Sequence, residues 1–217
     1  SIEVVNKEFY REISEYFTQL VGGSLYKGKK QEDYKALLKL PFVQDKSQTS
    51  LEFAVRLIGR VIFCWFLREK KSQVGLALMS EELLSLEAAK KYDDYYHRIL
   101  EPIFFEVLNK PVKSRRDDFA KESFSSVPYL NGGLFSPQDD DYYKRSNGDF
   151  QSQFHNTLII PDEWLIKFFE VLETYNFTID ENTRFDEALS IDPEMLGRIF
   201  ENLLAEINPE AGESARK

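Results

Sequence analysis

The sequence predicts a mainly α fold, a helical bundle-like arrangement with a small α+β insertion, and three observations support this prediction. Apolar residues recur at three- and four-residue spacing in several segments, which is the period of one buried helix face. Residues 51–69 are apolar on nearly every side, as expected for a central helix surrounded by other helices. Two short stretches, 157–160 and 176–179, have the composition of strands.

The first half of the chain carries several helix boundaries. Residues 3–21 place their apolar side chains on one face, and Gly22 and Gly23 supply a C-terminal stop. Residues 32–40 predict a short helix ended by a proline, and Ser80 followed by two glutamates predicts a capped helix start.

Proline and turn residues shape the middle of the chain. Residues 92–109 predict a helix that Pro102 kinks or divides. From 110 to 156 turn residues dominate, including a tight turn within "PYLNGGLF", so we expect a long irregular segment. After it, Pro161 and two acidic residues open a helix that lies between the two predicted strands.

The last predicted helix covers 192–207, with an aspartate cap, a proline at its first position and a broad apolar stripe. These elements predict four parts. They are a helical region 1–110 with its central helix at 51–69, a loop-rich segment 111–156, a small α+β part with the C-terminal helix at 157–207, and a polar lead-in at 208–217.

Composition restricts the classes of protein. The single cysteine, Cys64, excludes an intramolecular disulfide, and its apolar neighbours predict a buried thiol. No run of residues is apolar and long enough for a membrane span, and the N-terminus lacks the pattern of a signal peptide. We therefore expect a cytoplasmic protein with no membrane partner.

The net charge of −9 argues against a generic polyanion binder, because non-specific affinity for nucleic acid comes mostly from lysine and arginine. Local basic clusters are either solvated surface or phosphate contacts. The clusters are Lys27, Lys29 and Lys30; Arg68, Lys70 and Lys71; and Lys110 with Lys113, Arg115 and Arg116. Of these, Lys113, Arg115 and Arg116 are the candidate contacts to DNA phosphates.

No catalytic, cofactor-binding or metal-binding residue is predicted from sequence motifs. His97 and His155 are far apart and lack metal-type spacing, and His97 is expected on a helix surface or half-buried. The sequence Glu69-Lys70-Lys71 matches half of a nuclease motif without its acidic partner.

Four blocks, "PYLNGGLF", "IIPDEW", "YNFTIDENT" and "SIDPEMLGRIFENLLAEINPEAGESARK", follow one another in this order. Together with "VRLIGRVIFCWFLREK" upstream, they resemble the segment that precedes the catalytic domain of type IIG-like restriction-modification enzymes. Those enzymes are adenine-N6 DNA methyltransferases, often fused to an endonuclease, and typically bacterial. The resemblance covers roughly residues 51–217.

The resemblance implies a non-catalytic helical connector within a longer chain. A nuclease domain would precede it and a methyltransferase domain would follow "GESARK", so S-adenosylmethionine, and Mg²⁺ if a nuclease is present, would serve those parts. The expected partners are therefore the chain's own methyltransferase and nuclease domains, and DNA through the parent enzyme. No catalytic or cofactor residue carries over to this sequence.

Two alternatives remain open at this level. The chain would be a free-standing helical interaction module if its apolar C-terminal stripe docked a partner. It would be an enzyme of unknown type if the acidic run at Asp139, Asp140 and Asp141 held a metal ion.

Overall fold

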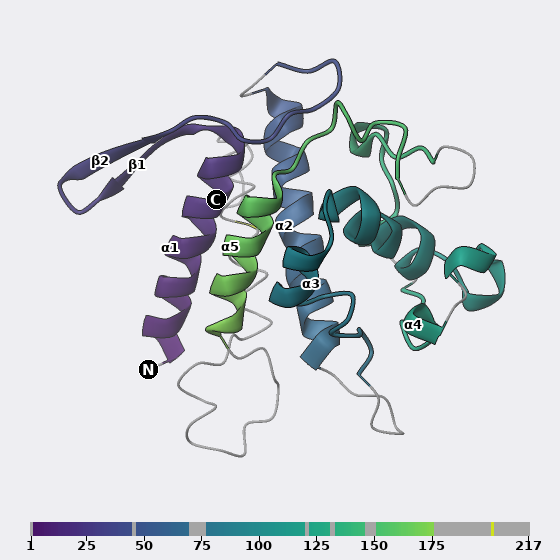
Figure 1. Cartoon of the computed structure of the whole chain (residues 1–217). Helices are drawn as coiled ribbons and strands as arrows, with labels where there is room; N and C mark the ends of the chain where they lie inside the picture. Colours follow the sequence, from purple (N-terminus) through teal and green to yellow (C-terminus); the bar gives the residue numbers. More distant parts are fainter. Residues whose placement is uncertain are drawn as a thin grey trace, which may run out of the picture. The chain divides into compact units, whose positions relative to one another are not determined.

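The computed structural model describes residues 2–44, 47–69, 77–119, 122–130, 133–145, 151–175 and 201. The predicted strand at 176–179, the predicted helix at 192–207 and the lead-in at 208–217 lie outside these residues, apart from position 201. The described part is mainly helical with one small antiparallel sheet, which confirms the predicted fold class (Figure 1). The chain divides into two compact units, one made of 1–59 with 173–217 and the other of 60–172.

The first unit opens with α1 (Ile2–Val21), which confirms the first predicted helix. Phe9, Ile13 and Leu20 on its apolar face are fully buried. The helix ends where predicted, because the amide of Gly22 donates to the carbonyl of Thr18 at 2.7 Å with a φ of +81°. A side chain at Gly22 would also place its Cβ 3.0 Å from the backbone nitrogen of Ala36, so glycine is required there.

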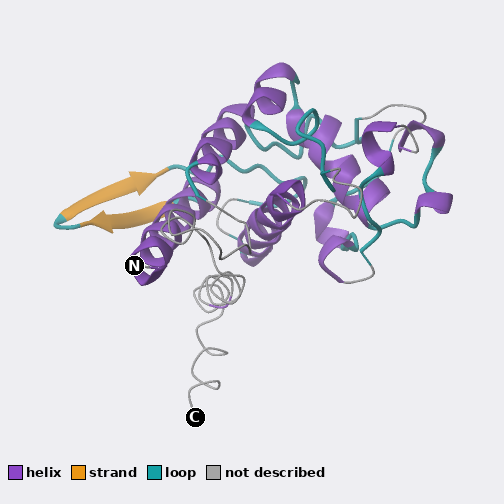
Figure 2. Ribbon diagram, turned by 90° about the horizontal axis from the view of Figure 1, so that it is seen from below, coloured by secondary structure: helices purple, strands orange, loops and turns teal. Residues whose placement is uncertain are grey.

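A β-hairpin follows α1 and is drawn in orange in Figure 2. Strands β1 (Gly23–Lys27) and β2 (Lys30–Tyr34) pair antiparallel, with Lys27 opposite Lys30. The two-residue turn begins at Gly28 with a φ of +65°, as two-residue hairpin turns with a left-handed first position require.

The hairpin replaces the helix predicted for 32–40, and that prediction is wrong. The chain after β2 instead runs along the C-terminal end of α1. The amides of Leu37 and Leu38 donate to the carbonyls of Gln19 and Leu20, at 3.1 and 3.0 Å. These carbonyls lack partners within α1, so pairing with them favours the extended chain over a new helix.

Helix α2 (Gln48–Glu69) confirms the central helix predicted at 51–69. The boundary between the two units falls within it, after Gly59. Helix α5 (Asp162–Glu173) confirms the helix predicted after Pro161, and five of its apolar side chains are buried. Trp65 of α2 packs on Phe169 of α5 with ring centroids 5.1 Å apart.

The second unit contains α3 (Leu86–Lys91), which starts later than predicted. Ser80 begins a turn, in which its carbonyl accepts from the amides of Leu83 and Leu84. Ser85 is the helix cap, because its hydroxyl accepts from the amide of Ala88 at 3.0 Å. Both serines match a capping pattern, and the helix starts after the second one, with Ala88 and Ala89 buried in its first turns.

Two π-helical stretches, η1 (Tyr96–Leu100) and η2 (Ile103–Leu108), occupy the segment 92–109. They confirm the predicted helix, but Glu101 and Pro102 between them have helical backbone angles, so the helix is not divided there. The hydrogen-bond pattern differs from an α-helix, since the amide of Glu101 donates to the carbonyl of Tyr96. Every residue of η2 is buried. Such π-helical turns are rare and frequently occur at functional sites.

Short turns make up the loop-rich segment. Its helical pieces are η3 (Val112–Ser114), η4 (Asp117–Phe119), α4 (Glu122–Ser125), η5 (Gly133–Phe135) and η6 (Asp139–Asp141). The strand predicted at 157–160 is absent, because the backbone turns there and the amide of Leu158 donates to the carbonyl of Phe154 at 2.8 Å. In the part of the chain described, no helix has both the length and the apolarity of a membrane span.

Candidate functional site

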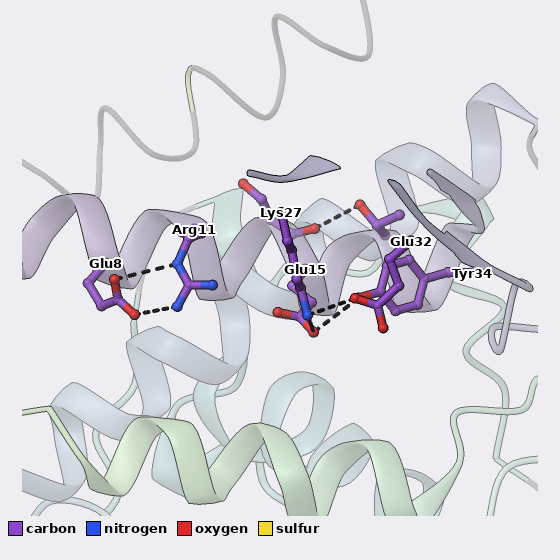
Figure 3. Close-up of polar contacts among 8 residues, drawn as sticks. Glu8, Arg11, Glu15, Lys27, Glu32 and Tyr34 are labelled. Carbon is purple, nitrogen blue, oxygen red and sulfur yellow. Dashed lines mark hydrogen bonds and ion pairs between the residues drawn. The ribbon is translucent and has the colours of Figure 1, made fainter. Parts of the chain in front are cut away.

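A polar network joins the hairpin to α1, and Figure 3 shows its side chains. The ammonium group of Lys27 lies 2.9 Å from the carboxylates of both Glu15 on α1 and Glu32 on β2. The hydroxyl of Tyr34 donates to Glu15 at 3.1 Å. Burial and this carboxylate raise the pKa of Tyr34 to about 12. The network holds the hairpin in one orientation against α1.

A groove of about 470 Å³ lies between α1 and the hairpin. Tyr10, Arg11, Ser14 and Glu15 of the helix form one wall, and Leu25, Tyr26, Lys27 and Gly28 form the other. The guanidinium of Arg11 is paired with the carboxylate of Glu8, one turn earlier. The cations that line this groove are thus already matched by carboxylates.

A buried arginine ties the loop segment to α2. Arg60 is 2% exposed, and its two terminal nitrogens bind the two carboxylate oxygens of Asp141 at 2.9 and 3.0 Å. Its Nε donates to the carbonyl of Leu134 at 2.7 Å, and the guanidinium stacks over the ring of Phe105. Bidentate pairing of this kind is the strongest form of arginine–carboxylate contact.

The pairing with Arg60 involves one of the three aspartates, 139–141, that the sequence offered as a possible metal site. Asp141 is fully buried, and besides Arg60 it accepts from the amide of Gln138 at 2.8 Å. Asp139 and Asp140 precede it in η6. Among the residues described, no three metal-ligating side chains lie together. Asp141 therefore serves as the partner of Arg60 in this structure.

A buried histidine–glutamate pair links η1 to the turn at 153–158. His97 and Glu101 are both 0% exposed, so the prediction of a surface or half-buried histidine is wrong. Nε2 of His97 lies 2.6 Å from the carbonyl of Leu158, and Nδ1 lies 3.2 Å from a carboxyl oxygen of Glu101. A carbonyl only accepts, so Nε2 carries a proton, and the pair shares one further proton between Nδ1 and the carboxyl group.

The environment of this pair raises the pKa of both side chains. Burial opposes the charged imidazolium, but the hydrogen bond and charge of Glu101 outweigh it and raise the pKa of His97. Burial also raises the pKa of Glu101, against the opposite effect of His97. The second carboxyl oxygen of Glu101 has no hydrogen-bond partner among the described residues. The pair is therefore best treated as one titrating unit.

A second buried glutamate, Glu106, lies in η2. Its carboxylate accepts from Lys110 at 2.6 Å and from the hydroxyl of Tyr143. Burial and this carboxylate together raise the pKa of Tyr143 above its usual range. Like Arg60 and His97, Glu106 joins the helical core of the second unit to a loop far along the chain.

The candidate phosphate contacts Lys113, Arg115 and Arg116 have different surroundings. Lys113 and Arg116 are exposed, and the guanidinium of Arg116 is 3.9 Å from the carboxylate of Asp118. Arg115 is 6% exposed and donates to three carbonyls, those of Lys110, Phe124 and Val127, at 3.2, 3.0 and 2.8 Å. Arg115 thus holds a loop together, and of the three only Lys113 and Arg116 face solvent. Phosphate contact by these two stays a prediction.

Replacing Arg115 by Met should lower the free energy of unfolding by about 2–3 kcal/mol, because two buried carbonyls and one part-buried carbonyl lose a charged donor. Thermal unfolding followed by circular dichroism measures this loss. The matched change Lys113→Met removes the same charge from an exposed site and should cost no more than about 0.5 kcal/mol. Equal losses in the two variants would contradict a structural role for Arg115.

The remaining residues considered from the sequence are structural or outside the described part. Cys64 is fully buried, which confirms the predicted buried thiol, and burial raises its pKa. Nδ1 of His155 lies 2.9 Å from the carbonyl of Ser152. Glu69 pairs with Arg68, while Lys70 and Lys71 are outside the described residues.

Sequence reasoning missed the buried pairs for two reasons. Arg60 and Asp141 are 81 positions apart, so no local pattern connects them. His97 and Glu101 are four residues apart on one helix, a spacing that places side chains together. That spacing was a usable signal for contact, although it carries no information about burial.

Comparison with known proteins places these features in a family. The model of a family described as "Domain of unknown function (DUF7814)" matches residues 24–190. The chain belongs to this family. The description assigns it no activity.

One similar protein carries a functional name. A protein of Methanocaldococcus jannaschii, provisionally named type II restriction enzyme and methyltransferase RM.MjaORFECS2P, is 32% identical over 154 residues. The match covers 70% of this chain and 12% of that protein, so this chain spans about an eighth of its relative's length. This member of the DUF7814 family is thus related to part of a restriction-modification enzyme, as the resemblance predicted. No solved structure matches the chain.

Proposed function

We propose that this chain is a non-catalytic helical connector of a type II restriction-modification enzyme, which positions a nuclease relative to a methyltransferase and to DNA. The observation that carries the proposal is the 32% identity to a protein named as both restriction enzyme and methyltransferase. The match occupies only 12% of that protein, which leaves ample length for catalytic domains elsewhere. S-adenosylmethionine and Mg²⁺ would act in those domains.

The structure supports a connector because its buried polar groups join segments that are distant in the sequence. Arg60, Arg115 and Glu106 each tie a loop to a helix or to another loop through charged hydrogen bonds. Helix α2 has 22 residues and so extends roughly 33 Å, about the length of ten base pairs. A helix held in this way would keep the nuclease at a fixed distance from the methyltransferase.

The connector predicts that stiffness of α2 controls where DNA is cut. The test enzyme is the M. jannaschii relative with its matching segment replaced by this chain. In it, Glu52→Gly with Arg56→Gly should loosen α2, since each glycine costs about 1 kcal/mol relative to alanine in a helix. We expect cleavage positions to spread over neighbouring base pairs, mapped by sequencing the cut ends, while methylation is retained.

Alanine at the same two positions provides the matched control, because it removes the same side chains but preserves the helix. The alanine variant should cut at one distance, as the parent chimera does. If the glycine variant is folded by circular dichroism and still cuts at a single distance, the connector proposal is wrong. Reading the gene beyond Lys217 separates the alternative of a free-standing module, which predicts no methyltransferase motif downstream.

A further inference from the structure

The hairpin and the segment after it form a basic surface in an acidic chain. Residues 24–39 contain five lysines and two acidic residues, a local net charge of +3, against −9 for the whole chain. Four of these lysines are exposed and within ion-pair distance of no other described residue. They are Lys29, Lys30, Lys35 and Lys39. We call them the hairpin lysines.

The acidic residues of the hairpin offset only part of the positive charge of this surface. Glu32 is paired with Lys27, which also binds Glu15 on α1. Asp33 accepts from the hydroxyl of Ser24 at 2.6 Å and from the amide of Gln31 at 3.0 Å. Glu32 thus lies within the network of Figure 3, Asp33 is bound by neutral donors, and the hairpin lysines are exposed to solvent.

The hairpin is held in a fixed orientation and carries an exposed aromatic ring. Lys27 and Tyr34 attach it to Glu15 of α1, and the segment after β2 is hydrogen-bonded to the last turn of that helix. Tyr26, which lines the groove beside α1, is 73% exposed and lies directly across from Gln31. Figure 1 shows the strands extending sideways from the end of α1.

We propose that the hairpin lysines bind the phosphate backbone of double-stranded DNA. Lysines without carboxylate partners neutralise phosphates and release counterions, and an exposed aromatic ring beside them is typical of nucleic-acid interfaces. A two-stranded ribbon is also an element that other proteins place in DNA grooves.

This inference rests on the proposed function, in which DNA is the substrate of the enzyme that carries the connector. It differs from the sequence-based candidates, since it places the contact on the hairpin rather than on Lys113 and Arg116. The test uses the 217-residue chain alone, without nuclease or methyltransferase. Its failure would therefore leave the cleavage-distance result for α2 unaffected.

The experiment measures binding of the chain to a fluorescent 24-base-pair duplex by anisotropy at several salt concentrations. Lys29→Gln with Lys30→Gln should weaken binding about tenfold at low salt and lower the salt slope by about 2, one for each lost phosphate contact. Lys35→Gln with Lys39→Gln should act in the same direction. The matched control is Lys90→Gln with Lys91→Gln, which removes the same charge from two exposed positions of α3.

Three outcomes would overturn the proposal. One is no binding of the native chain to the duplex at about 50 mM salt, where phosphate contacts are strong. Another is an equal loss of affinity in the control variant, which would show that the loss comes from the changed net charge of the chain and not from the hairpin. The third is binding of the native chain to phosphatidylserine vesicles without binding to the duplex, which would assign the lysines to a membrane surface.

Discussion

Replacing Arg60 by Met is expected to lower the free energy of unfolding by about 3–5 kcal/mol, because Asp141 would be left as an unpaired charge in the core. Both side chains are almost completely buried, and the carbonyl of Leu134 would lose its donor as well. Urea unfolding followed by tryptophan fluorescence measures the loss, since Trp65 lies on the same helix. The loss should appear as a lower unfolding midpoint.

Two further variants separate the ion pair from simple loss of packing. Asp141→Leu combined with Arg60→Met removes both charges and should recover part of the stability, because no buried charge is left unpaired. Arg116→Met breaks an exposed pair with Asp118 and should cost no more than about 0.5 kcal/mol. If the double variant is as unstable as Arg60→Met alone, the unpaired charge of Asp141 is not the cause.

The second large effect is expected at His97. Its replacement by Leu at pH 6 should cost about 3 kcal/mol, because the carbonyl of Leu158 and the carboxyl of Glu101 both lose a buried partner. The native pair should also make stability depend on pH. The folded protein holds the shared proton more tightly than the unfolded chain, since the pKa of His97 is raised on folding.

The direction of this dependence follows from linkage. The contribution of His97 is fully present below the unfolded histidine pKa of about 6.5 and is lost as the pH rises through the higher folded pKa. Glu101→Gln should remove this loss, because an amide can donate to neutral Nδ1 while Nε2 still donates to Leu158. Urea midpoints from pH 6 to pH 9 measure the difference between the variant and the native chain.

The pH profile of the native chain tests the shared proton directly. A native profile that is flat between pH 6 and pH 9 would show that His97 and Glu101 do not share a proton in the folded state.

Local patterns accounted for the long helices of this chain. The apolar spacing in residues 3–21 predicted α1, and the uniform apolarity of 51–69 predicted α2, because burial is encoded directly in which positions are apolar. Gly22 marked the end of α1, since only glycine adopts its backbone angle beside Ala36. The mainly α class followed from these segments alone.

Local sequence patterns did not predict the hairpin or the buried contacts of the candidate sites. Strands β1 and β2 are polar and half-exposed, so their sequence lacks the apolar alternation that identifies a strand. The segment after β2 has helical spacing, but its amides pair with carbonyls at the end of α1. That choice depends on where α1 ends in space, which no local window contains.

The sequence by itself determined the long helices α1, α2 and α5, the buried cysteine, the cluster of lysines at 27–30 and the relationship to restriction-modification enzymes. Each of these is a property of one segment or of an ordered series of segments. Only the tertiary structure decided which charges are buried and which remain in solvent. Arg115 was a candidate phosphate contact and His97 was expected at or near a surface, yet both are buried, as is Arg60, because carboxylates or carbonyls brought near by the fold supply their partners. Lys29 and Lys30 remain exposed.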